Sequence, residues 1–127
     1  MSEHGRGVLK RALSRLATSA KAHEAAELRQ DCTSAGCTPV NELRARDRVA
    51  VTGTLRTVTL RPRAGVPALV AELYDGSGSI SLIWLGRRQI AGIEPGRRLT
   101  CFGRVAHDHD QPVIFNPRYE LRPAGVE

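Results

Sequence analysis

The chain has 127 residues, enough for one domain with an appendage and a modest core. No apolar run approaches the roughly 20 residues of a membrane-spanning helix, and the N-terminus lacks the apolar centre of a signal peptide. We therefore expect a cytoplasmic protein without a membrane partner. The net charge is +6, and 17 of the 19 basic residues are arginine, which favours a polyanionic partner.

The three cysteines are Cys32, Cys37 and Cys101. An odd number in a chain without an export signal indicates reduced thiols rather than a disulfide framework. Cys32 and Cys37 would need two further ligands to hold zinc, and the sequence places none nearby. We expect no metal and no other cofactor.

Residues 1–30 are predicted to form an amphipathic basic helix. The apolar residues that recur at helical spacing are Leu9, Leu13, Leu16 and Ala20. Such a helix serves either as an arm for nucleic acid or a membrane surface, or as a packing element on the domain, on a protein partner or on a second copy of the chain. The packing interpretation is favoured, because narrow apolar stripes most often pack.

Residues 31–47 are predicted to form a linker, because Gly36 and Pro39 interrupt a helix. From Arg48 onward the hydrophobic period is two, which is typical of β-strands. The first strand, residues 48–60, changes parity along its length. We expect it to bend at Gly53 or to bulge near Thr57.

A β-hairpin is predicted around Asp75-Gly76-Ser77-Gly78, with strands over residues 68–75 and 79–85. Asp75 is expected to accept backbone hydrogen bonds in the turn, and Gly76 and Gly78 to supply positive φ. Alternation divides the side chains between the two faces of the sheet. The inward set is Leu69, Ala71, Leu73, Ile80, Leu82 and Trp84, and the outward set is Val70, Glu72, Tyr74, Ser81, Ile83 and Leu85.

A fourth strand is predicted over residues 97–106 and a fifth over residues 112–121, broken by Pro117. This order, with a long bent first strand, predicts a mainly β fold: a five-stranded OB-fold Greek-key barrel over residues 48–122, with an N-terminal α-helix. Residues 123–127 are left as a C-terminal tail.

Short motifs in this region resemble nucleic-acid-binding OB-fold domains of the anticodon-binding type. They are Val51-Thr52-Gly53, Leu73-Tyr74-Asp75-Gly76-Ser77-Gly78, Pro95-Gly96 and Gly103-Arg104-Val105. Ile83-Trp84-Leu85 and Asn116-Pro117-Arg118-Tyr119 are similar to the wedge domain of RecG-type helicases, and the whole is also similar to small actinobacterial OB-fold proteins. The resemblance implies nucleic-acid binding. It does not imply motor activity, because the chain contains no phosphate-binding Gly-x-x-x-x-Gly-Lys-Ser/Thr loop.

No catalytic constellation is evident in the sequence. Gly76-Ser77-Gly78 lacks the Gly-x-Ser-x-Gly spacing of a nucleophile elbow. His107-Asp108-His109-Asp110 falls where the loop between the fourth and fifth strands belongs, so a polar turn that contacts ligand is favoured over a metal site. The sequence therefore predicts a protein that is not an enzyme.

OB-folds bind with their second and third strands and the flanking loops, where aromatic rings stack on bases and arginines follow phosphates. Tyr74 is the favoured stacking residue, and Trp84 is the alternative if the strand register differs. The candidate nucleic-acid-binding residues are Arg56, Arg61, Arg63, Tyr74, Trp84, Arg87, Arg88, Arg104, His107, His109 and Arg118.

The sequence thus predicts a module that binds single-stranded or structured DNA or RNA, in DNA repair or recombination. The alternative is an OB-fold that binds a protein partner or acts as an accessory subunit. Two observations keep this alternative open. Only 4% of the residues are aromatic, and Glu72, Ile83 and Leu85 lie on the predicted binding face.

Overall fold

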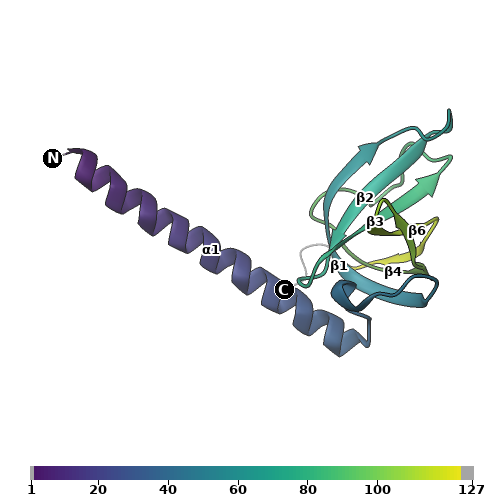
Figure 1. Cartoon of the computed structure of the whole chain (residues 1–127), viewed down its shortest axis with the longest axis horizontal. Helices are drawn as coiled ribbons and strands as arrows, with labels where there is room; N and C mark the ends of the chain where they lie inside the picture. Colours follow the sequence, from purple (N-terminus) through teal and green to yellow (C-terminus); the bar gives the residue numbers. More distant parts are fainter. Residues whose placement is uncertain (1, 124–127) are drawn as a thin grey trace.

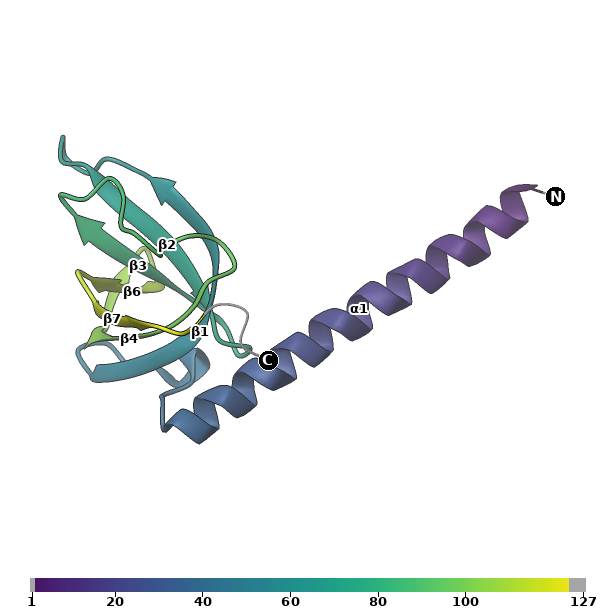
Figure 2. The same ribbon diagram turned by 180° about the vertical axis from the view of Figure 1, so that it is seen from behind.

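The structure is a computed structural model that describes the backbone of residues 2–123 and the side chains of residues 13–123. One long helix, α1 (Ser2–Ala35), is followed by a single 3-10 turn, η1 (Val40–Glu42), and then by β-strands. Figures 1 and 2 show that α1 projects away from the strand domain and touches it only near the helix C-terminus.

The strands form one mixed sheet with the order β5-β6-β3-β2-β1-β4-β7. They are β1 (Arg48–Leu60), β2 (Ala68–Tyr74), β3 (Ser79–Leu85), β4 (Arg98–Arg104), β5 (Ala106–Asp108), β6 (Gln111–Phe115) and β7 (Arg118–Leu121). Neighbouring strands are antiparallel except β3 and β6, which are parallel. The predicted mainly β class with an N-terminal helix is confirmed.

The predicted closed barrel of five strands is not confirmed, because the described sheet has seven strands and is not closed. The expected fifth strand divides at Pro117, which has no N–H to donate, and Asn116 before it has φ of 51°. Its first half, β6, pairs with β3, and its second half, β7, pairs with β4. The extra strand β5 pairs with β6, and its residues His107 and Asp108 fall in the predicted loop between the fourth and fifth strands.

Strand β1 pairs with β4 through its first half and with β2 through its second half. The register with β2 shifts between Leu55 and Thr57, which confirms the predicted bulge. A Cβ atom at Gly53 would collide with the carbonyl oxygen of Tyr74, so the absence of a side chain lets the strands approach where β1 changes partners.

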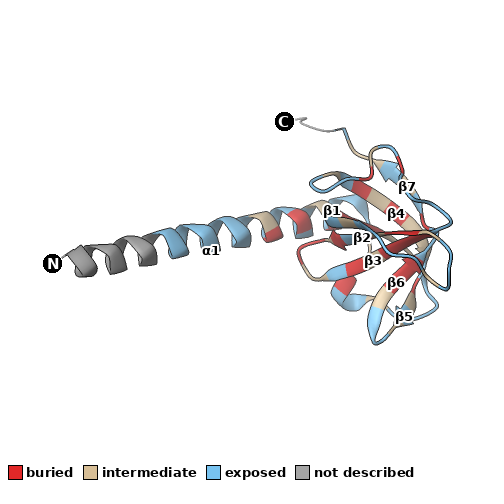
Figure 3. Cartoon of the chain, turned by 90° about the horizontal axis from the view of Figure 1, so that it is seen from above, coloured by how far each residue is buried: buried red, intermediate tan, exposed pale blue. Residues whose placement is uncertain are grey.

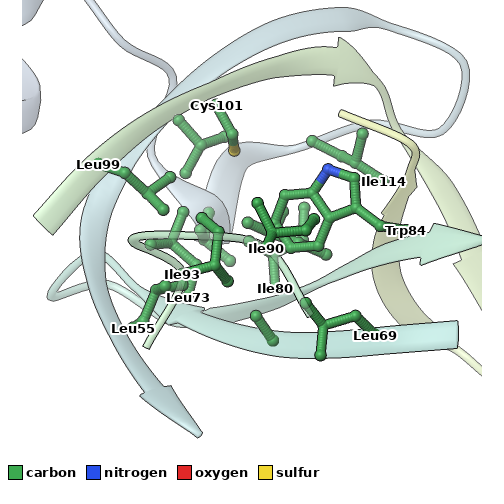
Figure 4. Packing of buried hydrophobic residues seen from close by; sticks show 14 residues of the cluster. Leu55, Leu69, Leu73, Ile80, Trp84, Ile90, Ile93, Leu99, Cys101 and Ile114 are labelled. Atoms are coloured by element: carbon green, nitrogen blue, oxygen red, sulfur yellow. The ribbon is translucent and has the colours of Figure 1, made fainter. Parts of the chain in front are cut away.

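The main core lies on the inner face of the curved sheet (Figure 4). It contains all six residues that alternation assigned to the inward face, together with Val51, Leu55, Leu99, Cys101 and Ile114. A smaller apolar cluster consists of Ala68, Ile83 and Val113, with Val70 and Ala106 packed against it. Ile83, predicted to face outward, is buried in this second cluster.

Helix α1 docks on the sheet through Ala25, Leu28 and Cys32, which are buried (Figure 3). Packing of the Leu/Ala stripe on its own domain, one of the options for the packing interpretation, is wrong for the described part of the stripe, and packing on a protein partner or on a second copy of the chain stays a prediction. Leu13 and Leu16 are 58% and 68% exposed, and Ala20 is exposed. The side chain of Leu9 lies outside the described residues. No helix of the described chain is long and apolar enough to span a membrane.

The helix continues to Ala35, so the start of the predicted linker is helical. Gly36 then adopts φ of 70°, and the N–H of Cys37 donates to the carbonyl of Cys32 over 3.0 Å. This pattern is that of a Schellman C-cap, in which a left-handed glycine lets the chain turn back over the last helical turn. The turn directs the following residues toward the sheet.

Candidate nucleic-acid interface

The hairpin turn after β2 holds the segment that follows the helix. The carboxylate of Asp75 is buried, and its Oδ1 accepts hydrogen bonds from Ser77 N, Ser77 Oγ and Gly78 N at 2.7–3.0 Å. Its Oδ2 accepts from the N–H of Val40 over 2.7 Å. Asp75 thus stabilises its own turn, as predicted, and also holds the first residue of η1 against that turn.

The same turn lies against helix α1. Gly76 has the predicted positive φ of 92°, and a Cβ atom there would collide with the carbonyl oxygen of Ala25. The Nη1 of Arg29 donates to the carbonyl of Gly76 over 3.0 Å. The positive φ predicted for Gly78 is wrong, since its φ is not in the left-handed region, and a Cβ atom there would lie 3.2 Å from a side-chain carbon of Val40. This turn is therefore a docking point for the helix.

Carboxylates on α1 bind arginines on the sheet. Glu24 lies 3.3 Å from Arg56, and Asp31 lies 3.1 Å from Arg122 and 3.7 Å from Arg98. Tyr74 faces outward, as predicted, but it is half-buried, and the guanidinium of Arg56 lies 4.5 Å from its ring centroid. The candidates Arg56 and Tyr74 therefore sit at the helix junction.

Trp84 is not a surface platform, and its inclusion among the binding residues is corrected. Its side chain belongs to the core and is 5% exposed. The indole Nε1 donates to the carbonyl of Pro117 over 3.1 Å, and the ring of Tyr119 packs edge-on at 5.7 Å. A buried indole with a satisfied N–H cannot stack on a base.

The opposite end of the sheet carries an open basic surface. The loop between β1 and β2 places Arg61 and Arg63 at the wall of a cavity of about 270 Å³, together with Asp108 and His109. The Nη1 of Arg63 lies 3.1 Å from Asp108 Oδ2, and its guanidinium carbon lies 5.4 Å from the ring centroid of Phe115. Arg63 is thereby held over an aromatic ring beside an open cavity.

Phe115 is the functional candidate that the sequence analysis missed. The residue is 37% exposed, and with Arg46, Arg104 and His107 it lines a second cavity of about 480 Å³. The alternation around Ile114, which points into the core, could have placed Phe115 on the outer face. We call the loop-end surface the set Arg61, Arg63, Arg104, His107, His109 and Phe115.

His107 and His109 lie in the β5–β6 hairpin and line different cavities. His109 and Asp110 have φ of 53° and 66°, the paired left-handed conformation of a tight two-residue hairpin turn. The expected polar turn is therefore present at the edge of the cavity. Among the described residues, no group of three or more His, Cys, Asp or Glu side chains is placed to hold a metal ion.

The remaining predicted residues lie outside the loop-end surface. Arg87 and Arg88 are exposed after β3, at the same end of the sheet, because Gly86 N donates to the carbonyl of Pro67 over 2.7 Å. Arg118 lies on β7, with its guanidinium carbon 4.6 Å from the ring centroid of Phe102. The structure thus brings together five of the predicted residues and separates the others.

The three thiols are poor nucleophiles at neutral pH. Burial in the core raises the pKa of Cys101 to about 12. Burial also raises the pKa of Cys32 and of Cys37. The neighbouring Cys37 adds to the rise at Cys32, whereas Arg122 partly opposes the rise at Cys37. All three are therefore protonated under ordinary conditions, which disfavours metal binding and covalent chemistry.

Comparison with known proteins identifies the fold. No family model and no curated protein matches the sequence. Among solved structures, the chain is similar to RecG in a structure described as RecG bound to three-way DNA junction, with a TM-score of 0.56 and 22% identity. The match covers 69% of this chain and only 12% of the RecG chain. At this level of identity, the similarity shows a shared fold.

Proposed function

We propose that this protein is a nucleic-acid-binding module that holds a single-stranded segment at the loop-end surface. The observation that carries the proposal is the guanidinium of Arg63 above the exposed ring of Phe115, beside a cavity lined by Arg61 and His109. Planar groups of this kind bind the faces of unpaired bases, which a duplex hides within its stack.

Charge supports the same proposal. Arg61 and Arg104 are exposed, and neither forms an ion pair among the described side chains. Such arginines are free to bind phosphate. The fold shared with RecG, a protein seen with a DNA junction, agrees with this proposal and favours a role in DNA repair or recombination. We propose that the module acts by binding alone, without a catalytic step.

The test is a fluorescence anisotropy titration with single-stranded DNA, single-stranded RNA and duplex DNA at two salt concentrations. Three or four phosphate contacts predict that log affinity falls with log salt with a slope of about −2 to −3 for a single strand, at ~0.7 per contact. Single strands should bind more tightly than duplex. A flat salt response would contradict an electrostatic site.

Variants locate the site. Phe115→Ala should remove a stacking contact of ~1 to 3 kcal/mol, and Arg63→Gln should weaken binding because it removes the guanidinium plane above that ring. The matched control is Leu85→Ala, which truncates a 41% exposed apolar residue at the same end of the sheet, outside both cavities. Equal losses for Phe115→Ala and Leu85→Ala would show that the site lies elsewhere.

The alternative is a protein-interaction module. It is favoured by one observation: Leu13 and Leu16 remain exposed on the projecting helix. Indifference of the protein to all three nucleic acids, at both salt concentrations, would select this alternative and would exclude the nucleic-acid proposal.

A further inference from the structure

We propose that the outer face of β1, β4 and β7 carries a second contact surface for the same single strand, so that the bound segment is longer than the loop-end surface alone. We call it the β4 surface and define it by Arg48, Phe102, Arg104 and Arg118. Arg104 belongs to both surfaces. This inference rests on the proposed function, and its site is separate from the second and third strands that the sequence analysis favoured.

The first observation is a pair of like charges. Arg48 and Arg104 are directly opposite each other in the β1–β4 ladder, and both are exposed. Like charges at directly opposed positions destabilise an antiparallel pair. Among the described side chains, no carboxylate forms an ion pair with either arginine. A phosphate between the two guanidinium groups would relieve the repulsion.

The second observation is an aromatic ring beside this pair. Phe102 lies two residues from Arg104 on the same face and is opposite Arg118 of β7. Its ring is partly exposed, with the guanidinium carbon of Arg118 4.6 Å from its centroid. Aromatic rings and guanidinium planes both stack on unpaired bases. This arrangement repeats that of Arg63 and Phe115.

The third observation is that carboxylates of α1 neutralise the arginines at only one end of this face. On the same outer face, Arg98 and Arg122 are held by Glu27 and Asp31 of α1. Charge at that end of the face is therefore neutralised within the protein. The β4 surface is the part of the face beyond these ion pairs, and its arginines keep their charge available for an external anion.

The fourth observation is continuity. Arg104 and Phe115 line one cavity with His107, so the β4 surface adjoins the loop-end surface directly. Phe115 and Arg118 are also joined through Asn116 and Pro117, at the break between β6 and β7. A strand that stacks at Phe115 is thereby directed past Arg104 toward Phe102. Single-stranded nucleic acid is the occupant that matches a row of arginines with two interleaved aromatic rings.

The test uses two lengths of single-stranded oligonucleotide, about 5 and about 15 nucleotides, because OB-folds occupy roughly 4–16 nucleotides. Arg118→Gln and Phe102→Leu should leave binding of the short oligonucleotide unchanged and weaken binding of the long one about tenfold. Arg118→Gln should also reduce the salt slope of the long oligonucleotide by ~0.7. Phe102→Leu keeps apolar bulk and removes only the aromatic plane.

The charge-matched control is Arg15→Gln, on the exposed part of α1 away from the sheet. It should change neither affinity. The circular dichroism spectra of Arg118→Gln and Phe102→Leu should match that of the parent protein. A match shows that weaker binding does not result from unfolding.

The outcomes separate the two proposals. If Arg63→Gln weakens both lengths while Arg118→Gln and Phe102→Leu change neither, the β4 surface is overturned and the proposed function stands. If Arg15→Gln weakens binding of the long oligonucleotide as much as Arg118→Gln does, the loss reflects only the lower net charge of the protein, and the β4 surface is overturned. If polyglutamate displaces the long oligonucleotide as well as unlabelled oligonucleotide does, base stacking at Phe102 is overturned. If the parent protein binds neither length, the proposed function fails.

Discussion

Two groups of arginines on this small sheet differ in what balances their charge. Arg56, Arg98 and Arg122 are bound by carboxylates of α1 at 3.1–3.9 Å. Arg48, Arg104 and Arg118 have no carboxylate partner among the described side chains, and two of them oppose each other across a strand pair. The first group joins the helix to the sheet, and the second leaves a positive surface open to an external anion.

The same residue type is therefore either paired with a carboxylate or left without one, depending on whether the helix lies beside it. Arginines attract a polyanion only where carboxylates of the same chain do not already neutralise their charge. Stability and helix docking should therefore respond differently to changes in the two groups.

The largest expected effect is on the free energy of unfolding, and it distinguishes the core residue Trp84 from the surface residue Phe102. Trp84→Ala should lower the free energy of unfolding by ~3 to 5 kcal/mol, because it empties a large volume in the main core and removes the hydrogen bond to Pro117. Phe102→Ala, on the open face, should cost much less. Urea unfolding of both variants measures the difference. Similar losses would show that Phe102 supports the fold and is not free to bind a ligand.

The next effect concerns the carboxylate that fixes the docked region. Asp75→Ala leaves the buried N–H of Val40 and the donors of the turn without their acceptor, which should cost ~1 to 3 kcal/mol. Hydrogen exchange should accelerate most in the C-terminal turns of α1 and in η1. Ser77→Ala, the control, removes one hydroxyl that donates to Asp75 and accepts from the exposed N–H of Asn41, and it should cost less because the buried carboxylate and its other hydrogen bonds stay in place. Uniform acceleration over the whole sheet would contradict a local docking role.

A smaller effect is expected from the ion pairs themselves. Asp31→Asn removes the carboxylate shared by Arg98 and Arg122, but these side chains are a third to nearly half exposed, so the loss should be below ~1 kcal/mol and should shrink at high salt. Arg118→Gln removes no ion pair among the described side chains, so its cost should be limited to the contact with the ring of Phe102 and should change little with salt. A loss for Arg118→Gln with the same salt dependence as that for Asp31→Asn would remove the distinction between the two groups.

The smallest expected effect is on the rate at which Cys32 is alkylated. Cys32 lies on the docked side of helix α1 and is buried, and burial raises its pKa, so alkylation should be slow in the parent protein. High salt or Asp31→Asn should speed it, because both weaken the ion pairs that hold the helix. Cys101, with a pKa raised to about 12, should stay unlabelled and serves as the internal reference. Arg118→Gln should not alter the rate, and a change would mean that the open face also supports docking.

Much of the sheet could be predicted because alternation is a local property. The inward set of β2 and β3, the bulge in β1 and the turn at Asp75 follow from residues close in sequence. Pro117 predicted the break in the last strand. The sequence did not predict which strand each half pairs with, because that pairing depends on residues far along the chain.

The candidate site was harder to predict for the same reason. Residue type and parity selected Arg61, Arg63 and Arg104 as candidates and placed Tyr74 outward. They did not show that Arg56 lies over Tyr74 beside the helix, or that Phe115 lies under Arg63. Both contacts join segments that are distant in sequence, and a strand pattern carries no information about what covers its outer face.

The sequence by itself determined the mainly β character, the N-terminal helix, the excess of arginine and the parity of the strands that face the core. Only the tertiary structure decided which arginines remain free. The physical reason is that the charge available to a partner is what remains after the chain has paired its own ions. That remainder depends on the acidic turns of α1 lying against Arg56, Arg98 and Arg122 and leaving Arg48, Arg104 and Arg118 exposed.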